Sequence, residues 1–176
     1  NYENRKNVDW ADRKKQLLDL IAQTRVSGKY DCIVAVSGGK DSYFLTEMVV
    51  NHLKLNPLLV RFDDSYTMSK AAKWNFENLY KVFSCDLFTA RLPDRLYKEM
   101  TQKAFIEFAN FPFVDYLIYT LPIVCASELG IKLVIFGENP VYEYGTSDKD
   151  SPFVNMSQYN EIREWIKREF LVTKLA

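Results

Sequence analysis

The segment CIVAVSGGKDS, residues 32–42, decides the fold. Its first half, Cys32 to Val36, is a short continuous apolar run, which is typical of a strand buried on both faces of a sheet. The glycine turn at 37–39 ends that strand abruptly, and apolar residues recur at helical spacing from Phe44 onward. A buried strand, a tight turn and a helix in direct succession predict one unit of an α/β fold.

The same alternation continues along the chain. Further strands are predicted at 57–62, 86–89 and 132–136, and further helices at 68–83, 94–108 and 115–129, the last containing Pro122. This pattern predicts an α/β fold with a doubly wound parallel sheet and helices on both faces.

Two segments flank this pattern. Asp9 is a suitable N-cap for a cover helix that starts at Trp10 and stops at Gly28. We expect one domain over residues 1–145, including this cover helix. Residues 146–176 are expected to form a linker and a C-terminal amphipathic helix, as part of a longer native chain.

Composition narrows the class of protein. Lys plus Arg equal Asp plus Glu at 23 each, so no overall field would attract a nucleic acid, and we expect none as a partner. The three cysteines lie far apart and only one histidine is present, which disfavours a zinc site. With no signal peptide and no apolar run near 20 residues, the chain is expected to be cytoplasmic and free of the membrane.

The glycine turn carries the most specific chemical signal. Ser37, Gly38 and Gly39 leave a strand and enter a helix, so backbone N–H groups there can bind a phosphate at the positive end of the helix. The spacing fits neither GxxxxGK[ST] nor GxGxxG. Lys40 adds positive charge, and Ser42 can hydrogen-bond a phosphate oxygen. The competing interpretation is a simple turn in which Ser37 caps the helix.

Polar residues follow two other strands at the same predicted edge of the sheet, where ligands bind in open α/β sheets. Asp41 and Glu138 are the candidate Mg²⁺ ligands and, with Lys40, the candidate catalytic residues. The backbone of Phe62 and the carboxylate of Asp63 are candidate nucleotide contacts. Asp63 and its neighbour Asp64 could equally cap the next helix.

Other side chains admit two interpretations each. Tyr116, Tyr119 and the segment 111–113 could line a ligand pocket, although core packing suits most of them better. Packing also suits Cys32 and Cys125, and His52 is expected near a helix end and at the surface. Trp165 and Phe170 could mark a partner surface or pack on their own domain, and packing is favoured.

The loop SGGKDS resembles the PP-loop of the N-type ATP pyrophosphatases. Four segments, in order, resemble the N-acetyl sugar amidotransferases of lipopolysaccharide (O-antigen) biosynthesis within that superfamily: YDCIVAVSGGKDS, LNPLLVRFDD, WNFENL and LVIFGENPVYEYG. The resemblance implies that ATP and Mg²⁺ bind and that a nucleotide-linked N-acetyl sugar is adenylated on its acetamido oxygen. Ammonia then replaces that oxygen, and AMP and pyrophosphate are released.

The same resemblance implies separate glutaminase and cyclase-like subunits that supply the ammonia, and a homo-oligomer is possible. Two alternatives remain open. A PP-loop tRNA thiolation enzyme shares the loop but commonly needs a cysteine pair, which this chain lacks. A nucleotide-binding module of similar fold, as in universal-stress or electron-transfer-flavoprotein relatives, would hold a nucleotide without catalysis.

Overall fold

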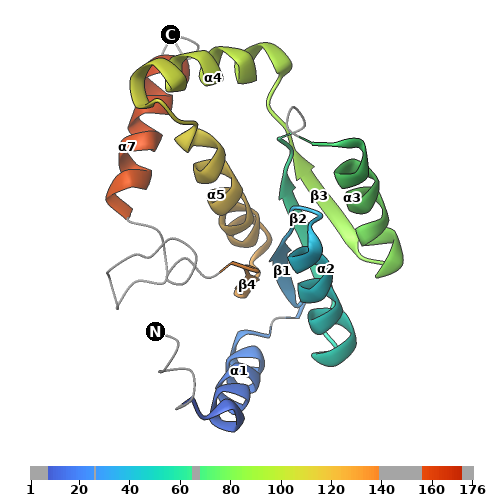
Figure 1. Ribbon diagram of the computed structural model, residues 1–176. Coiled ribbons are helices and arrows are strands. Elements are labelled where there is room, and N and C mark those ends of the chain that lie inside the picture. Colours follow the sequence, from blue (N-terminus) through green and yellow to red (C-terminus); the bar gives the residue numbers. More distant parts are fainter. Residues whose placement is uncertain (1–7, 26, 65–67, 139–155, 172–176) are drawn as a thin grey trace.

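The computed structural model describes residues 8–25, 27–64, 68–138 and 156–171. At its centre lies a four-stranded parallel sheet in the order β3-β2-β1-β4 (Figure 1). The strands are β1 (Cys32–Ala35), β2 (Pro57–Phe62), β3 (Asp86–Ala90) and β4 (Val134–Ile135). Because all four strands run in the same direction, their carboxyl ends lie along one edge of the sheet.

Helices connect the strands. They are α1 (Trp10–Thr24), α2 (Lys40–Glu47), which continues as the π-helical turn η2 (Met48–His52), α3 (Lys70–Val82), α4 (Asp94–Phe108), α5 (Pro112–Leu129) and α7 (Met156–Ile166), which continues as η3 (Lys167–Leu171). His52 is the last residue of η2 and is exposed, as its position in the sequence predicts.

Both faces of the sheet are covered, which confirms the doubly wound α/β fold. Side chains alternate along each strand, so Cys32, Val34 and Leu59 pack on one face with residues of α2, η2 and α3. Ile33, Leu58 and Val60 point to the other face and pack with residues of α5. Burial on both faces explains the uninterrupted apolar runs in β1 and β2, of which Cys32, Ile33 and Val34 are wholly buried.

Helix α1 differs from the predicted cover helix. Asp9 caps it as predicted, since its Oδ1 accepts hydrogen bonds from the backbone N–H groups of Ala11 and Asp12, both at 3.0 Å. The helix ends at Thr24, before Gly28, because Arg25 adopts an extended ψ of 128°. None of the residues Trp10–Thr24 is buried, so the expectation of a cover helix is wrong. Its apolar residues do not reach the sheet, apart from Ile21, which packs partly on the core.

Helix α5 is the longest described helix and begins earlier than predicted. Pro112 stands in its first turn, where a missing N–H does no harm, so the helix begins at Pro112 rather than Asp115. Pro122 lies inside the helix and is buried. The length and mean hydropathy of α5, 1.2, would also suit a membrane span. One side of α5 packs across β1 and β2, through residues such as Ala126.

The C-terminal helix belongs to the core. Trp165, 2% exposed, packs with Phe62, Phe113 and Ile162, and its Nε1–H donates to Glu107 Oε2 at 2.7 Å. The prediction that Trp165 and Phe170 pack on their own domain is therefore confirmed. The predicted boundary between residues 145 and 146 lies outside the described residues.

Candidate active site

A cavity of about 300 Å³ opens at the carboxyl edge of the sheet. Three strand ends and helix α5 surround it, as the rule for ligands in open α/β sheets requires. Its lining residues are Ala35, Val36, Ser37, Gly39, Asp41, Ser42, Val60, Arg61, Phe62, Asp64, Met68, Ile118, Phe136, Gly137 and Glu138.

The glycine turn forms one wall of this cavity. Gly38 has φ of +85°, a conformation that side chains disfavour, and a Cβ there would lie 2.8 Å from the Cβ of Phe76 in α3. Glycine is therefore required at position 38 by both the backbone and the packing. Gly39 has an ordinary φ of −77°, and a Cβ there would meet nothing closer than 3.7 Å. Its lack of a side chain leaves the cavity wall open.

Ser42 holds the turn from the first turn of α2. It is 6% exposed, and its Oγ accepts hydrogen bonds from the backbone N–H groups of Ser37 at 2.9 Å and Gly38 at 3.2 Å. Two loop amides are thus satisfied inside the protein, and the hydroxyl of Ser42 organises the loop. The hydroxyls of Ser37 and Ser42 lie 3.3 Å apart.

The start of α2 has the properties of an anion site. Its N-cap is Gly39, and no side chain caps the helix, so Ser37 is not the helix cap. Gly39 and Asp41 both line the cavity, so the positive end of the helix lies beside it. An oxyanion bound at the start of α2 would accept the hydrogen bonds that a capping side chain normally accepts.

Lys40 and Asp41 form a pair at the mouth of the loop. Lys40 Nζ contacts the two carboxylate oxygens of Asp41 at 2.8 and 2.9 Å, and both side chains are strongly exposed. Asp41 lines the cavity, whereas Lys40 is not among the lining residues. In this arrangement the charge of Lys40 offsets that of Asp41.

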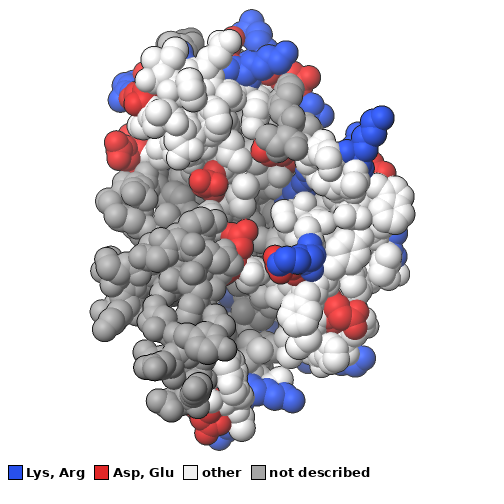
Figure 2. Space-filling view, in the orientation of Figure 1, with Lys and Arg blue, Asp and Glu red and all other residues white. Residues whose placement is uncertain are grey.

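Three carboxylates line the cavity, from Asp41, Asp64 and Glu138. Among the described residues, no three His, Cys, Asp or Glu side chains lie close enough to hold a metal by themselves. Mg²⁺ usually binds through one or two carboxylates together with phosphate oxygens and water, so this donor set fits a magnesium ion that arrives with a nucleotide. Elsewhere on the face drawn in Figure 2, acidic and basic groups are interspersed.

Glu138 follows β4 and reaches the cavity beside α5. It accepts a short hydrogen bond from the hydroxyl of Tyr119. Asp115 lies one turn earlier on α5. Its pKa is raised, mainly by burial and to a smaller extent by the negative charge of Glu138. The side of α5 that carries Asp115, Ile118 and Tyr119 therefore contributes to this end of the site.

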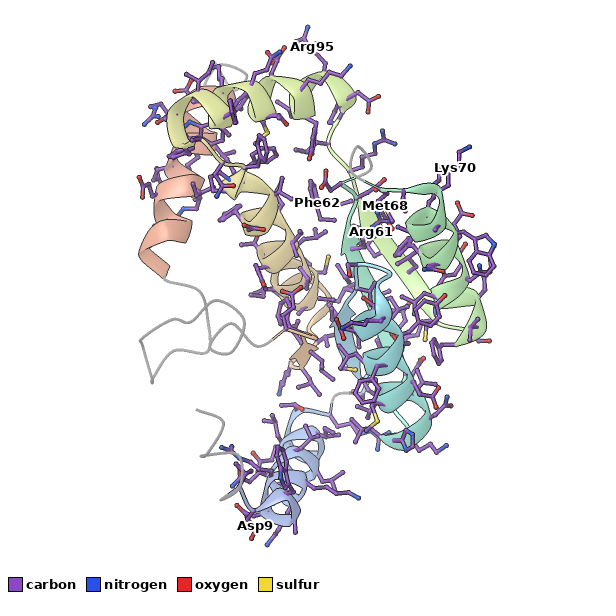
Figure 3. All side chains as sticks on the ribbon, viewed as in Figure 1. Asp9, Arg61, Phe62, Met68, Lys70 and Arg95 are labelled. Carbon is purple, nitrogen blue, oxygen red and sulfur yellow. The ribbon has the colours of Figure 1, made fainter. Side chains whose placement is uncertain are left out.

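Arg61 is the residue that the sequence analysis missed. It lies within β2, is 8% exposed, and lines the cavity. Figure 3 shows Arg61 and Met68 on the side of β2 that faces α3, with Phe62 on the side that faces α5. An arginine inside the apolar strand sequence PLLVRF was the available signal, because a buried cation needs a partner.

The predicted site residues divide into two groups. Ser37, Gly39, Asp41, Ser42, Phe62 and Glu138 come together as lining residues of one cavity. Gly38, Lys40 and Asp63 lie beside it without lining it. Asp63 pairs instead with Arg61, Oδ1 to Nη2 at 2.9 Å, and its N–H donates to Ala90 O at 2.8 Å.

The cysteines are not arranged for chemistry. Burial raises the pKa of Cys32 to about 12, with a smaller effect from Asp31. Burial likewise raises the pKa of Cys85 and Cys125. Thiols of this kind stay protonated near neutral pH and are poor nucleophiles.

The four-stranded parallel sheet in the order β3-β2-β1-β4, with the glycine turn and the cavity at its carboxyl edge, belongs to an α/β fold that is also found in solved structures. Solved structures with this fold include the NH3-dependent NAD synthetase of Campylobacter jejuni, with a TM-score of 0.56 and 15% identity over 95% of this chain and 78% of that one. The NMN synthetase of Francisella tularensis has a TM-score of 0.53 and 14% identity, over 94% of this chain and 74% of that one.

Sequence comparison adds one relative. An uncharacterised protein of Methanocaldococcus jannaschii is 40% identical over 75 residues, which are 42% of this chain and 27% of that protein. The match thus spans about a quarter of the relative's length. No family model matches the sequence.

Proposed function

We propose that this protein is an ATP-dependent amidotransferase that works through an adenylated intermediate. Its acceptor would be a nucleotide-linked N-acetyl sugar, whose acetamido group becomes an acetamidino group. One observation carries the proposal: the uncapped start of α2 and the carboxylates of Asp41 and Glu138 line the same cavity. Such a site suits a polyphosphate with its magnesium ion.

The loop and α2 are assigned to ATP. The amides at Gly39 and Asp41 would bind the phosphates as the missing helix cap, while Ser42 keeps the turn in shape from inside. The strand end at Phe62 and Asp64 would contact the nucleoside. Mg²⁺, held by Asp41 with the phosphate oxygens, would supply positive charge to the departing pyrophosphate.

The opposite wall is assigned to the acceptor. Ile118 and Phe136 offer apolar contact for the acetamido methyl group, and the Tyr119–Glu138 pair offers polar contact. In the first step the acetamido oxygen attacks the α-phosphorus and pyrophosphate leaves. In the second, ammonia attacks the imidate carbon, loses a proton, and AMP departs with the former amide oxygen. We assign acceptance of that proton to Glu138.

The wider setting is also a proposal. The resemblance to sugar amidotransferases supports a role in lipopolysaccharide biosynthesis in the cytoplasm, with ammonia from separate glutaminase and cyclase-like subunits. A structural neighbour, the Campylobacter jejuni enzyme, is described as NH3-dependent. That description is consistent with ammonia as the nitrogen donor here.

Two other functions fit the site less well. A thiolation enzyme would need a reactive cysteine, whereas burial raises the pKa of Cys32, Cys85 and Cys125. A regulatory nucleotide-binding module would have no need of carboxylates beside the phosphate loop, yet Asp41 and Glu138 both line the cavity.

Isotope transfer tests the proposal. A panel of UDP-linked N-acetylhexosamines labelled with ¹⁸O in the acetamido oxygen is incubated with the protein, Mg·ATP and ammonium, and the AMP is analysed by mass spectrometry. The proposal predicts one ¹⁸O atom in each AMP formed. Unlabelled AMP would show that water, rather than the amide oxygen, attacks the α-phosphorus.

A further inference from the structure

Arg61 is a buried cation with a fixed orientation. Its guanidinium carbon lies 3.9 Å from the centre of the Phe76 ring, so the group is held by a cation–π contact. Its Nη2 contacts Asp63 Oδ1 at 2.9 Å and the sulfur of Met68. Asp63 is itself anchored between β2 and β3 by its N–H bond to Ala90. The guanidinium therefore needs little rearrangement to meet a ligand in the cavity that Arg61 lines.

Within the part of the chain that the structure describes, most of the hydrogen-bonding capacity of Arg61 is unused. A guanidinium carries five N–H donors, and in the described residues its hydrogen bonds come from Nη2 alone. The donors on Nε and Nη1 have no hydrogen-bond acceptor there. Burial lowers the pKa of Arg61, and Asp63 and Asp64 oppose that effect by favouring the charged form. A buried charged donor without acceptors is costly, so a ligand that supplies oxygen atoms would be favoured.

Among the described residues that line the cavity, Arg61 is the only cation. The lining carboxylates are Asp41, Asp64 and Glu138, and Lys40 is turned to Asp41 outside the lining. A triphosphate entering this site would therefore meet one fixed positive charge on the protein, besides the start of α2. Phe76 connects Arg61 to the glycine loop, because it packs against both Gly38 and the guanidinium of Arg61.

We propose that Arg61 is a phosphate-binding residue of the nucleotide site, in which its unused donors contact the phosphate chain while Asp63 and Phe76 hold its orientation. This inference rests on the proposed function for the identity of the nucleotide. The anion contact itself needs only a phosphate or pyrophosphate group in the cavity.

Titration calorimetry with adenosine, AMP and ATP in the presence of Mg²⁺ tests this role. Arg61→Met should weaken ATP binding about ten-fold or more, because a charge-assisted contact is lost, and should change adenosine binding by less than about two-fold. Arg61→Lys, which keeps the charge but not the planar donor group, should lie between. Arg95→Met is the matched control, because it removes the same charge from an exposed pair with Glu99 on α4. Equal losses for adenosine and ATP would overturn the proposal, as would unchanged ATP binding.

A measurement on the wild-type protein does not depend on the folding of any variant. In ¹⁵N-arginine-labelled protein, the Nε–H signal of Arg61, assigned with Arg61→Lys, should move in a saturable way when inorganic pyrophosphate is added. A signal that stays in place while ATP binds would overturn the role of Arg61 and leave the proposed function standing. A signal that moves with pyrophosphate in a protein that does not bind ATP would support the anion contact and refute the proposed function.

Discussion

Gly38 packs against Phe76 so closely that a Cβ at position 38 would lie 2.8 Å from the Cβ of Phe76. This contact joins the loop after β1 to helix α3. It ties the shape of the turn to the packing of the domain, since Phe76 itself is buried in the core. The turn is therefore held by tertiary structure as well as by its own hydrogen bonds.

Gly38→Ala should disrupt both stability and nucleotide binding. The substitution forces a side chain into φ of +85° and against Phe76, so we expect a loss of at least about 1–3 kcal/mol in the free energy of unfolding. Urea unfolding measures it. Gly28→Ala is the matched control, because a Cβ there meets nothing within 4 Å, and it should leave stability and ATP binding close to wild type.

Ser42→Ala should destabilise the loop from inside. It removes the acceptor of two N–H groups, one part-buried at Ser37 and one buried at Gly38, at a cost of about 1–3 kcal/mol. Thermal unfolding and ATP titration should both report the loss. Ser127→Ala, at an exposed position on α5, is the control. Equal behaviour of the two variants would refute a structural role for the Ser42 hydroxyl.

Asp41→Asn and Glu138→Gln should abolish product formation without unfolding the protein. Both residues are exposed at the cavity, so their thermal midpoints should stay close to that of the wild type. Loss of the proposed magnesium ligand Asp41, or of the proposed proton acceptor Glu138, should lower kcat at least about 100-fold. The exposed residue Glu99 on α4 provides the control, and Glu99→Gln should retain full activity. Full activity in Glu138→Gln would remove that residue from the mechanism.

The buried thiol of Cys32 should lower the free energy of unfolding at alkaline pH. The pKa of the Cys32 thiol is about 12 in the folded protein and 9.0 in the unfolded chain. Between pH 9 and 12 the folded state therefore binds more protons than the unfolded state. Stability attributable to Cys32 is therefore complete below pH 9. It is lost as the pH rises above 9, by up to about 1.4 kcal/mol per pH unit.

Cys32→Val should remove that part of the alkaline loss. Urea unfolding of both proteins from pH 7 to 11 gives the difference in stability at each pH. A difference that does not change above pH 9 would contradict the buried, protonated state of Cys32. A half-buried thiol, Cys125, serves for comparison, and Cys125→Val should show a smaller effect.

Much of this fold could be predicted because its signals are local. The apolar runs of β1 and β2 follow from burial on both faces of the sheet. The glycine at position 38 indicates the turn that follows β1. Glu138 was predicted from its place after a strand, since parallel strands end at one edge. By contrast, the exposed state of α1 could not be predicted, because Leu17 and Leu20 repeat at a spacing that also suits a buried helix face.

Side-chain partners in the site were less predictable. Lys40 was expected to add its charge to the phosphate site, but in the structure it pairs with its neighbour Asp41. Asp63 stays a predicted nucleotide contact, and its pair with Arg61 was not predicted. The orientation of Arg61 depends on where α3 places the ring of Phe76. The two residues are 15 positions apart, and no local sequence pattern encodes their contact.

The proposed reaction depends most on cleavage of ATP between its α- and β-phosphates at this cavity. The direct measurement is chromatography of the nucleotides, with a coupled assay of pyrophosphate, after incubation with Mg·ATP, ammonium and the UDP-linked N-acetylhexosamine panel. We predict AMP and pyrophosphate in equal amounts, formed only when acceptor and ammonium are both present. ADP with inorganic phosphate would contradict the account.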